Sequence, residues 1–211
     1  MKKIFSILCL MGIGILWSQD YYFNRLIQYQ ENETNTIQLL YNSQNFDFFL
    51  LLKDDASGVT ADLYDQPNKR IHNFDVNKPM GHSGLAYGYT YASTERFVKS
   101  KTRNSLNYEF TKKESDNNYD QVNLKVFDEK NPDKSILTAD LTMRNTHSSK
   151  FEEFNLCCLM GFDYLELIQP KENYVVIQAE IRDQSGKRFK YNLVSDQIVQ
   201  FTLRVPEKPK R

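Results

Sequence analysis

From about residue 35 onward, short runs of β-type apolar residues alternate with clusters of turn-forming residues. No long stretch shows the 3.6-residue period of an amphipathic helix, and the gaps between runs are too short for crossover helices. The gaps are rich in Asn, Asp, Ser, Gly and Pro, as at 42–45, 54–58, 66–68, 131–133 and 184–186. The pattern predicts an all-β protein of antiparallel strands.

Two apolar runs are too continuous for strands that have one solvent-facing side. Residues 46–52 read Phe-Asp-Phe-Phe-Leu-Leu-Leu, and residues 174–181 begin Tyr-Val-Val-Ile. Such runs are typical of strands that are covered on both faces. They predict two packed layers, formed either by an antiparallel sandwich or by a strongly curved meander sheet.

At most one or two short helices are expected. Residues 20–30 place Phe23, Leu26 and Ile27 at helix-compatible spacing, and residues 94–101 follow a Ser/Thr cap. The apolar run 154–160 is interpreted as a strand instead.

The N-terminus has the layout of a secretory signal peptide. Lys2 and Lys3 precede an apolar run over 4–17, which is too short to span a bilayer, and cleavage is expected after Ser18. A lipoprotein reading at Cys9 is disfavoured, because the preceding residue is large and the apolar run continues beyond it. The sequence therefore predicts a periplasmic or secreted protein without a transmembrane anchor.

The remaining residues 19–211 are expected to form a single all-β domain, with a possible weak boundary near 93–104. The whole chain has 211 residues and 40% hydrophobic residues, including 14 Phe and 13 Tyr, which is enough for one substantial core. Cleavage leaves 25 basic and 27 acidic residues, a net charge of −2. This balance argues against nucleic-acid binding.

Two adjacent cysteines, Cys157 and Cys158, remain after cleavage. Neighbouring cysteines close only a strained ring, so no structural disulfide is expected. We interpret the pair as two small apolar side chains, with a redox switch or an intermolecular bridge as alternatives.

Histidines and acids form no recognisable catalytic or metal site. His72, His82 and His147 are not spaced as metal ligands on one face, and the expectation is ordinary turn or surface histidines. The loop 79–84 lacks the last glycine of a serine nucleophile elbow. No cofactor is expected.

The acidic pairs Asp54-Asp55 and Glu152-Glu153 suit glycoside hydrolysis only if two acids meet across a cleft. In three hairpins a strand ends in an acid, Asp65, Asp128 or Asp183, which is expected to cap its turn.

The most distinctive pattern is Gly-Leu-Ala-Tyr-Gly-Tyr-Thr-Tyr-Ala over 84–92. On a strand, Tyr87, Tyr89 and Tyr91 share one face with Leu85. Tyrosines in a row can bind a ligand such as a sugar, or they can pack across the sheet. Packing is the preferred interpretation, and the three tyrosines are the candidate ligand-binding residues.

These features favour an exported, non-enzymatic β-rich binding protein: a carrier, surface-associated module or inhibitor whose partner is a protein, lipid or glycan. The first alternative is a carbohydrate-binding or glycan-active protein that uses the tyrosine row. A second is a structural component of an envelope assembly, which a long unpaired edge strand or a large apolar patch would indicate.

Overall fold

The computed structural model describes residues 18–77, 87–96, 106–116, 118–159 and 168–206. The predicted signal sequence up to residue 17, the loop 79–84 with His82, and segment 97–104 lie outside the described residues, as does the predicted strand 164–168 except for Ile168. The weak boundary, the 97–101 part of a predicted helix and the export signal therefore stay predictions.

The described residues form one antiparallel sheet of 11 strands in the order β6-β5-β4-β3-β2-β1-β11-β10-β9-β8-β7. Its strands are β1 (Ser18–Glu31), β2 (Asn35–Asn42), β3 (Asn45–Asp55), β4 (Gly58–Asp65), β5 (Arg70–Asn77), β6 (Gly88–Arg96), β7 (Leu106–Ser115), β8 (Asp120–Asp128), β9 (Asn131–Asn145), β10 (Tyr174–Asp183) and β11 (Arg188–Pro206). The all-β antiparallel prediction is confirmed, and of its two arrangements the strongly curved sheet is the one observed.

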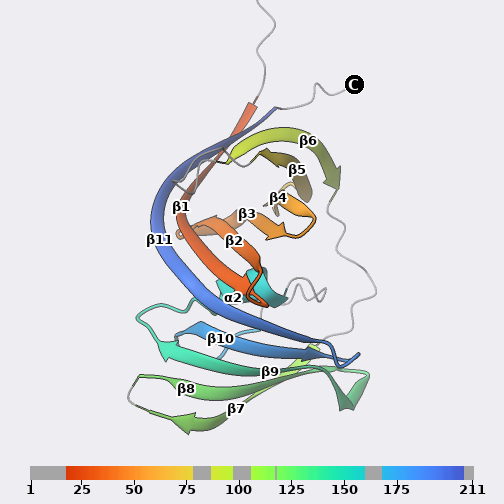
Figure 1. The fold of residues 1–211 in the computed structure, drawn as a ribbon, viewed down its shortest axis with the longest axis vertical. Helices are drawn as coiled ribbons and strands as arrows, with labels where there is room; N and C mark the ends of the chain where they lie inside the picture. Colours follow the sequence, from red (N-terminus) through yellow and green to blue (C-terminus); the bar gives the residue numbers. More distant parts are fainter. Residues whose placement is uncertain (1–17, 78–86, 97–105, 117, 160–167, 207–211) are drawn as a thin grey trace, which may run out of the picture.

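The curvature is concentrated in β1 and β11, the two long strands at the middle of the sheet. They pair with each other along their length, whereas β1 pairs with β2 only from Arg25 onward. Two register shifts in this pair, at Phe23/Arg25 and at Gln28/Tyr29, increase its bend. Figure 1 shows the result, in which β1 and β11 arc past β2–β6 on one side and lead to β7–β10 on the other.

The bend creates two apolar cores on opposite faces of β2 and β3. We call the first the strand core; it consists of Tyr21, Phe23, Leu26, Leu40, Leu50, Leu52, Ala61, Leu63, Phe74, Leu203 and Val205. We call the second the helical core; it consists of Ile27, Tyr29, Ile37, Leu39, Tyr41, Phe49, Leu51, Val122, Leu124, Val126, Leu137, Ala139, Leu141, Met143, Phe151, Phe154, Leu156, Cys157, Cys158, Leu159, Ile168, Tyr174, Val176, Ala179, Ile181 and Tyr191.

Strand β3 separates the two cores. Leu50 and Leu52 belong to the strand core, and Phe49 and Leu51 point the other way into the helical core. The prediction that residues 46–52 include a strand covered on both faces is confirmed.

The predicted helix over 20–30 is wrong, because these residues belong to β1. The first half of the strand supplies Tyr21, Phe23 and Leu26 to the strand core, and the second half supplies Ile27 and Tyr29 to the helical core. Leu26 and Ile27 are both buried because they face opposite sides of a strand that has a core on each side. Because the buried face of β1 changes between Leu26 and Ile27, the spacing of its apolar residues matches that of an amphipathic helix. In the second predicted helix, 94–96 also lie in a strand, β6.

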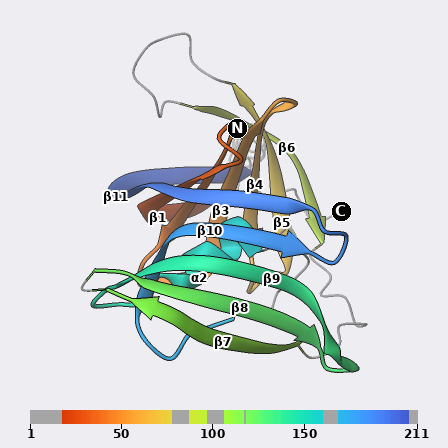
Figure 2. The same ribbon diagram turned by 60° about the horizontal axis from the view of Figure 1, so that its bottom comes forward.

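The predicted strand over 154–160 is also wrong, because α2 (Phe151–Phe154) continues into the π-helical turn η1 (Asn155–Leu159). We call Phe151–Leu159 the helical segment. It lies inside the curve, between β2–β3 and β8–β10 (Figures 1 and 2). A helix satisfies most of its backbone hydrogen bonds internally, so it can occupy this place without pairing to a strand.

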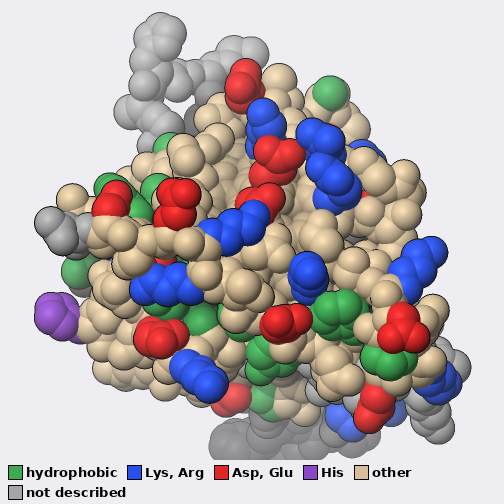
Figure 3. All heavy atoms as spheres, turned by 90° about the horizontal axis from the view of Figure 1, so that it is seen from below, with side chains coloured by type: hydrophobic (Ala, Val, Ile, Leu, Met, Phe, Trp, Pro, Cys, Tyr) green, Lys and Arg blue, Asp and Glu red, His purple; other side chains and the backbone are tan. Residues whose placement is uncertain are grey.

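One face of the molecule mixes both signs of charge. On the face seen from below, Lys and Arg side chains alternate with Asp and Glu, and apolar side chains lie between them (Figure 3). This distribution agrees with the near-zero net charge of the chain.

Candidate functional site

The helical segment fills the concave side of the sheet. Eight of its nine residues are buried, all except Glu152. The ring of Phe154 packs 5.7 Å from that of Tyr29 and 5.5 Å from that of Phe151, whose ring also contacts Phe110 of β7 at 5.5 Å. The segment therefore joins the two arms of the curved sheet through side-chain packing.

Polar contacts attach the two ends of the segment to its surroundings. At its start, the Lys150 amide donates to the Tyr174 carbonyl at 2.8 Å, and just before it the Thr146 amide donates to the Asn173 carbonyl at 3.0 Å. Further along, the buried Asn155 side-chain amide donates to the Ile168 carbonyl at 2.6 Å. These few bonds, rather than a strand ladder, hold the backbone in place.

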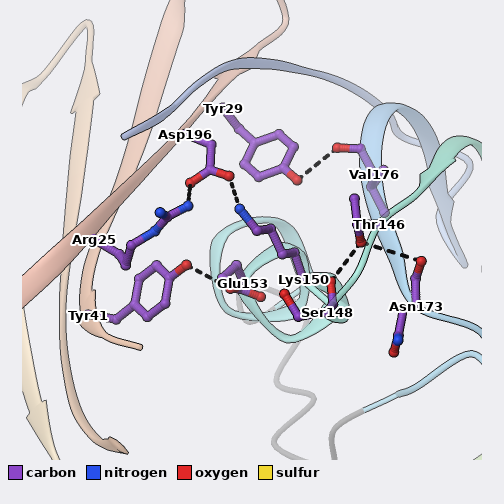
Figure 4. A network of polar contacts seen from close by, with 10 residues as sticks. All are labelled: Arg25, Tyr29, Tyr41, Thr146, Ser148, Lys150, Glu153, Asn173, Val176 and Asp196. Atoms are coloured by element: carbon purple, nitrogen blue, oxygen red, sulfur yellow. Dashed lines mark hydrogen bonds and ion pairs between the residues drawn. The ribbon is translucent and has the colours of Figure 1, made fainter. Parts of the chain in front are cut away.

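A polar cluster lies between the segment and the strands β1, β2 and β11 (Figure 4). Asp196 of β11 forms ion pairs with Arg25 of β1 and with Lys150. The Tyr41 hydroxyl donates to Glu153 Oε1 at 2.7 Å. Two cations and two acids thus face one another beside the apolar core.

Glu153 is the least satisfied member of this cluster. Its side chain is buried, and its Oε2 has no hydrogen-bond partner among the described residues. Burial raises the pKa of the Glu153 carboxyl, while its hydrogen bond to Tyr41 and the charges of Lys150 and Arg25 act in the opposite direction. Burial is also the main cause of the lowered pKa of Lys150.

Sequence reasoning considered Glu153 only as half of an acidic pair. The available signal was its position in Phe-Glu-Glu-Phe-Asn-Leu-Cys-Cys-Leu, where an acid stands inside an apolar run. Its partners Arg25, Tyr41 and Asp196 are far away in sequence and carry no local signal.

A cavity of about 130 Å³ opens at the edge of the helical core. Its buried wall is formed by Ile37, Tyr191 and the two thiols of the π-helical turn. The rest of its lining is Glu31, Asn35, Thr36, Lys53, Asp54, Asp55 and Phe189, near the ends of the β1–β2 and β3–β4 hairpins.

Cys157 and Cys158 are therefore buried free thiols that line a cavity. Burial raises the pKa of both thiols well above the usual value. A neutral, apolar thiol is a weak nucleophile, which agrees with their interpretation as packing residues.

The three candidate tyrosines lie elsewhere, against the strand core. Tyr87, Tyr89 and Tyr91 are half-buried, and the residues between them are exposed. The Tyr89 ring packs 5.4 Å from Phe201 and 6.3 Å from Phe74. Their side chains point inward, and none of them lines the cavity described above.

His72 is buried in the strand core, so the expectation of a turn or surface histidine is wrong for it; His147 is exposed. His72 Nδ1 lies 2.6 Å from the Thr94 hydroxyl, and Nε2 lies 3.3 Å from the Tyr21 hydroxyl. The ring is held by cross-strand polar contacts that residue spacing along the chain did not indicate.

The hairpin acids cap their turns as expected. Asp65 accepts from the Asn68 backbone amide, Asp128 accepts from that of Lys130, and Asp183 accepts from those of Ser185 and Lys187. Asp65 is also buried and accepts a hydrogen bond from the Tyr21 hydroxyl at 2.6 Å.

Within the described ranges, no group of three or more His, Cys, Asp or Glu side chains is arranged to hold a metal ion. No helix in this part of the chain is long and apolar enough to cross a membrane.

No protein-family model and no curated protein matches the sequence. Among solved structures, a LolA superfamily protein from Nitrosomonas europaea is similar over 86% of both chains, with 11% identity and a TM-score of 0.27. A structure described as an outer membrane lipoprotein-sorting protein domain, from Vibrio parahaemolyticus, is similar over 85% of both chains, with 11% identity and a TM-score of 0.23. At these values the two structures assign neither a family nor a function to this chain.

Proposed function

We propose that the protein is an exported, non-enzymatic carrier that binds the apolar chain of an amphipathic ligand on the concave face of its sheet. The observation that carries this proposal is the helical segment, which covers an apolar surface built by strands from both arms of the sheet. The segment contributes no strand to the sheet. It can leave the concave face without breaking a strand pair, and the surface that it covers then becomes available.

The free energy of apolar burial is comparable for the helical segment and for the alkyl chain of a ligand. The buried side chains of Phe151, Phe154, Leu156 and Leu159 contribute together on the order of 6–12 kcal/mol of apolar burial. An alkyl chain of about ten methylene groups contributes roughly 8 kcal/mol at ~0.8 kcal/mol per group. An apolar chain can therefore replace the segment at a small net cost.

The contacts in the polar cluster allow the helical segment to leave the concave face and to return to it. Lys150 and Arg25 share one acid, Asp196, so Asp196 keeps a partner when the segment and Lys150 leave. When the helical segment leaves, the Glu153 carboxyl, whose Oε2 lacks a partner among the described residues, reaches water. Its desolvation penalty is then removed. Both effects lower the cost of opening.

The glycan-binding alternative is less well supported. It requires Tyr87, Tyr89 and Tyr91 to present their rings to solvent, and the contacts with Phe74 and Phe201 turn this face inward. This alternative predicts that replacing the three tyrosines with Ala abolishes ligand binding without destabilising the fold.

Amide hydrogen exchange tests the carrier proposal, with the neutral fluorophore N-phenyl-1-naphthylamine as the ligand. Binding is expected to raise exchange in residues 151–159 while the β8–β10 amides stay protected. Lys150→Met, which removes one ion pair of Asp196, is expected to accelerate uptake of the fluorophore. Lys113→Met removes the exposed ion pair with Asp140 and serves as the matched control. Unchanged exchange in 151–159 on binding would contradict the role of the segment as a cover.

Export is tested separately. Intact-mass analysis of the secreted or periplasmic protein is expected to give a chain that begins at or near Gln19. A species that retains the apolar run 4–17, or one acylated at Cys9, would contradict this part of the proposal.

A further inference from the structure

The cavity at the edge of the helical core connects two different environments. Its inner wall includes Cys157 and Cys158 of the helical segment together with Ile37, all of them buried. Its outer rim includes the exposed Lys53 and Asp55. A path from the charged hairpin ends to the segment therefore exists in the covered state.

The volume of the cavity limits what it can hold. A space of about 130 Å³ corresponds to roughly four water-sized groups of ~30 Å³ each. It is too small for a whole lipid, but it accommodates the junction between a polar head and the first carbons of one alkyl chain. The remainder of such a chain would take the place of the segment on the concave face.

The rim is predominantly acidic. Among the described residues, Glu31, Asp54 and Asp55 line the cavity together with the cation Lys53. The Lys187 ammonium lies 4.5 Å from the ring centroid of the lining Phe189. Hydrogen bonds from Ser57 lower the pKa of Asp55, so this carboxylate is ionised at neutral pH.

Glu31 is held in position at the wall of the cavity. The Tyr191 hydroxyl donates to its Oε1 at 2.8 Å, and the Asn35 amide donates to its Oε2 at 2.9 Å. Two donors thus fix the Glu31 carboxylate at the cavity wall, where a cationic head group can lie beside it.

We infer that ligands enter the carrier through this cavity, which we call the portal. The portal selects single-chain amphiphiles with a cationic head over those with an anionic head. The inference rests on the proposed function and adds the route and the head-group chemistry. The acidic rim attracts the head, and Ile37 of β2 contacts the first carbons of the chain as it enters.

Competition binding tests this selectivity, with N-phenyl-1-naphthylamine as the displaced fluorophore. Decyltrimethylammonium and decanoate carry chains of similar length and are used below their micellar concentrations. At low salt, the cation is expected to displace the fluorophore at about fivefold lower concentration, and the preference shrinks at high salt. The variant Asp54→Asn with Asp55→Asn is expected to lose the preference. Glu129→Gln with Asp133→Asn removes two exposed acids on the β8–β9 hairpin and is expected to keep it.

Thiol chemistry supplies an independent measurement that needs no variant. Saturating decyltrimethylammonium is expected to accelerate the reaction of Cys157 and Cys158 with a neutral maleimide severalfold, because the helical segment that carries both thiols leaves the concave face. Unchanged thiol reactivity would contradict release of the segment. Displacement of the fluorophore without head-group preference overturns the portal and leaves the carrier function intact. If the fluorophore does not bind at all, the carrier function and the portal both fail.

Discussion

The two cores of the molecule each bury a tyrosine–carboxylate pair, and the pairs differ in how fully they are satisfied. In the strand core, Asp65 accepts hydrogen bonds from Tyr21 and from both the backbone and the side chain of Asn68. In the helical core, Glu153 accepts from Tyr41, but its second oxygen has no described partner. A fully bonded buried acid stabilises one arrangement, whereas a half-bonded acid weakens the arrangement that buries it.

The cores also differ in what encloses them. The strand core is built from β1–β5 and β11, with partly buried side chains of β6 and Tyr87 packed against it. The helical core includes a segment attached by side chains and a few terminal hydrogen bonds. We therefore expect changes in the strand core to loosen the paired strands around it and changes in the helical segment to act on that segment alone.

The largest effect is expected from replacing Tyr87, Tyr89 and Tyr91 together with Ala. Because these rings pack against the strand core, the free energy of unfolding is expected to fall by about 4 kcal/mol or more. Urea unfolding measures the change, and the exposed Tyr22→Ala and Tyr108→Ala supply controls with small effects. A triple variant that stays stable but loses a ligand bound by the parent protein would favour the glycan-binding alternative.

A single-ring comparison sharpens the contrast between the cores. Phe154→Ala and Phe74→Ala each remove a buried ring and are expected to cost about 3 kcal/mol. Hydrogen exchange separates their consequences: Phe154→Ala is expected to expose amides in 151–159 only, and Phe74→Ala those of β3–β6. Equal loosening of all strands by Phe154→Ala would show that the helical segment is integral to the sheet.

A smaller effect is expected from the double variant Cys157→Ala with Cys158→Ala. The loss of two buried sulfur atoms is expected to lower the free energy of unfolding by about 1–3 kcal/mol, with the sheet retained. Denaturation with and without reducing agent provides the measurement. If the variant fails to fold and reductant unfolds the parent as well, a disulfide role is indicated instead.

The smallest change is expected from Glu153→Gln, and it depends on pH. Burial raises the pKa of the folded carboxyl, so its favourable contribution is complete below the unfolded pKa of about 4.3 and is lost as pH rises through the folded value. Removing the charge is therefore expected to raise Tm by about 2 °C at pH 8 and to have little effect near pH 4. Asp65→Asn, at a satisfied acid, is expected to lower Tm at neutral pH. A Glu153→Gln variant that is less stable at pH 8 would show that the carboxylate is stabilising.

The sequence predicted the strands and, as one of two arrangements, the strongly curved sheet, but it did not locate the bend in β1 and β11. Alternation and turn residues are local signals, so β2–β5 and the doubly covered run within 46–52 were predictable. The strand at 20–30 was missed because its burial switches faces at Leu26 and Ile27, a consequence of the distant pairing with β11. The helical segment was missed because an apolar run buried on all sides has no periodicity to distinguish helix from strand.

The candidate site was harder to predict from the sequence than the fold. Tyr87, Tyr89 and Tyr91 were found because their alternation is local, whereas the cavity brings together side chains from β1–β3, β11 and the helical segment. The residues around Glu153 lie up to 171 positions apart, as for Arg25 and Asp196. Only the folded chain brings these charges together.

The central pairing of β1 with β11 has a consequence for how the chain folds. It joins Ser18 to Pro206, so the strand in the middle of the sheet receives its second neighbour only when β11 is present. Contacts of such long sequence separation slow folding, and until they form β1 and β10 each have an unpaired edge. During synthesis of the first ten strands, the available pairs are those within β1–β6 and those within β7–β10, and the two groups are joined into one sheet when β11 is added.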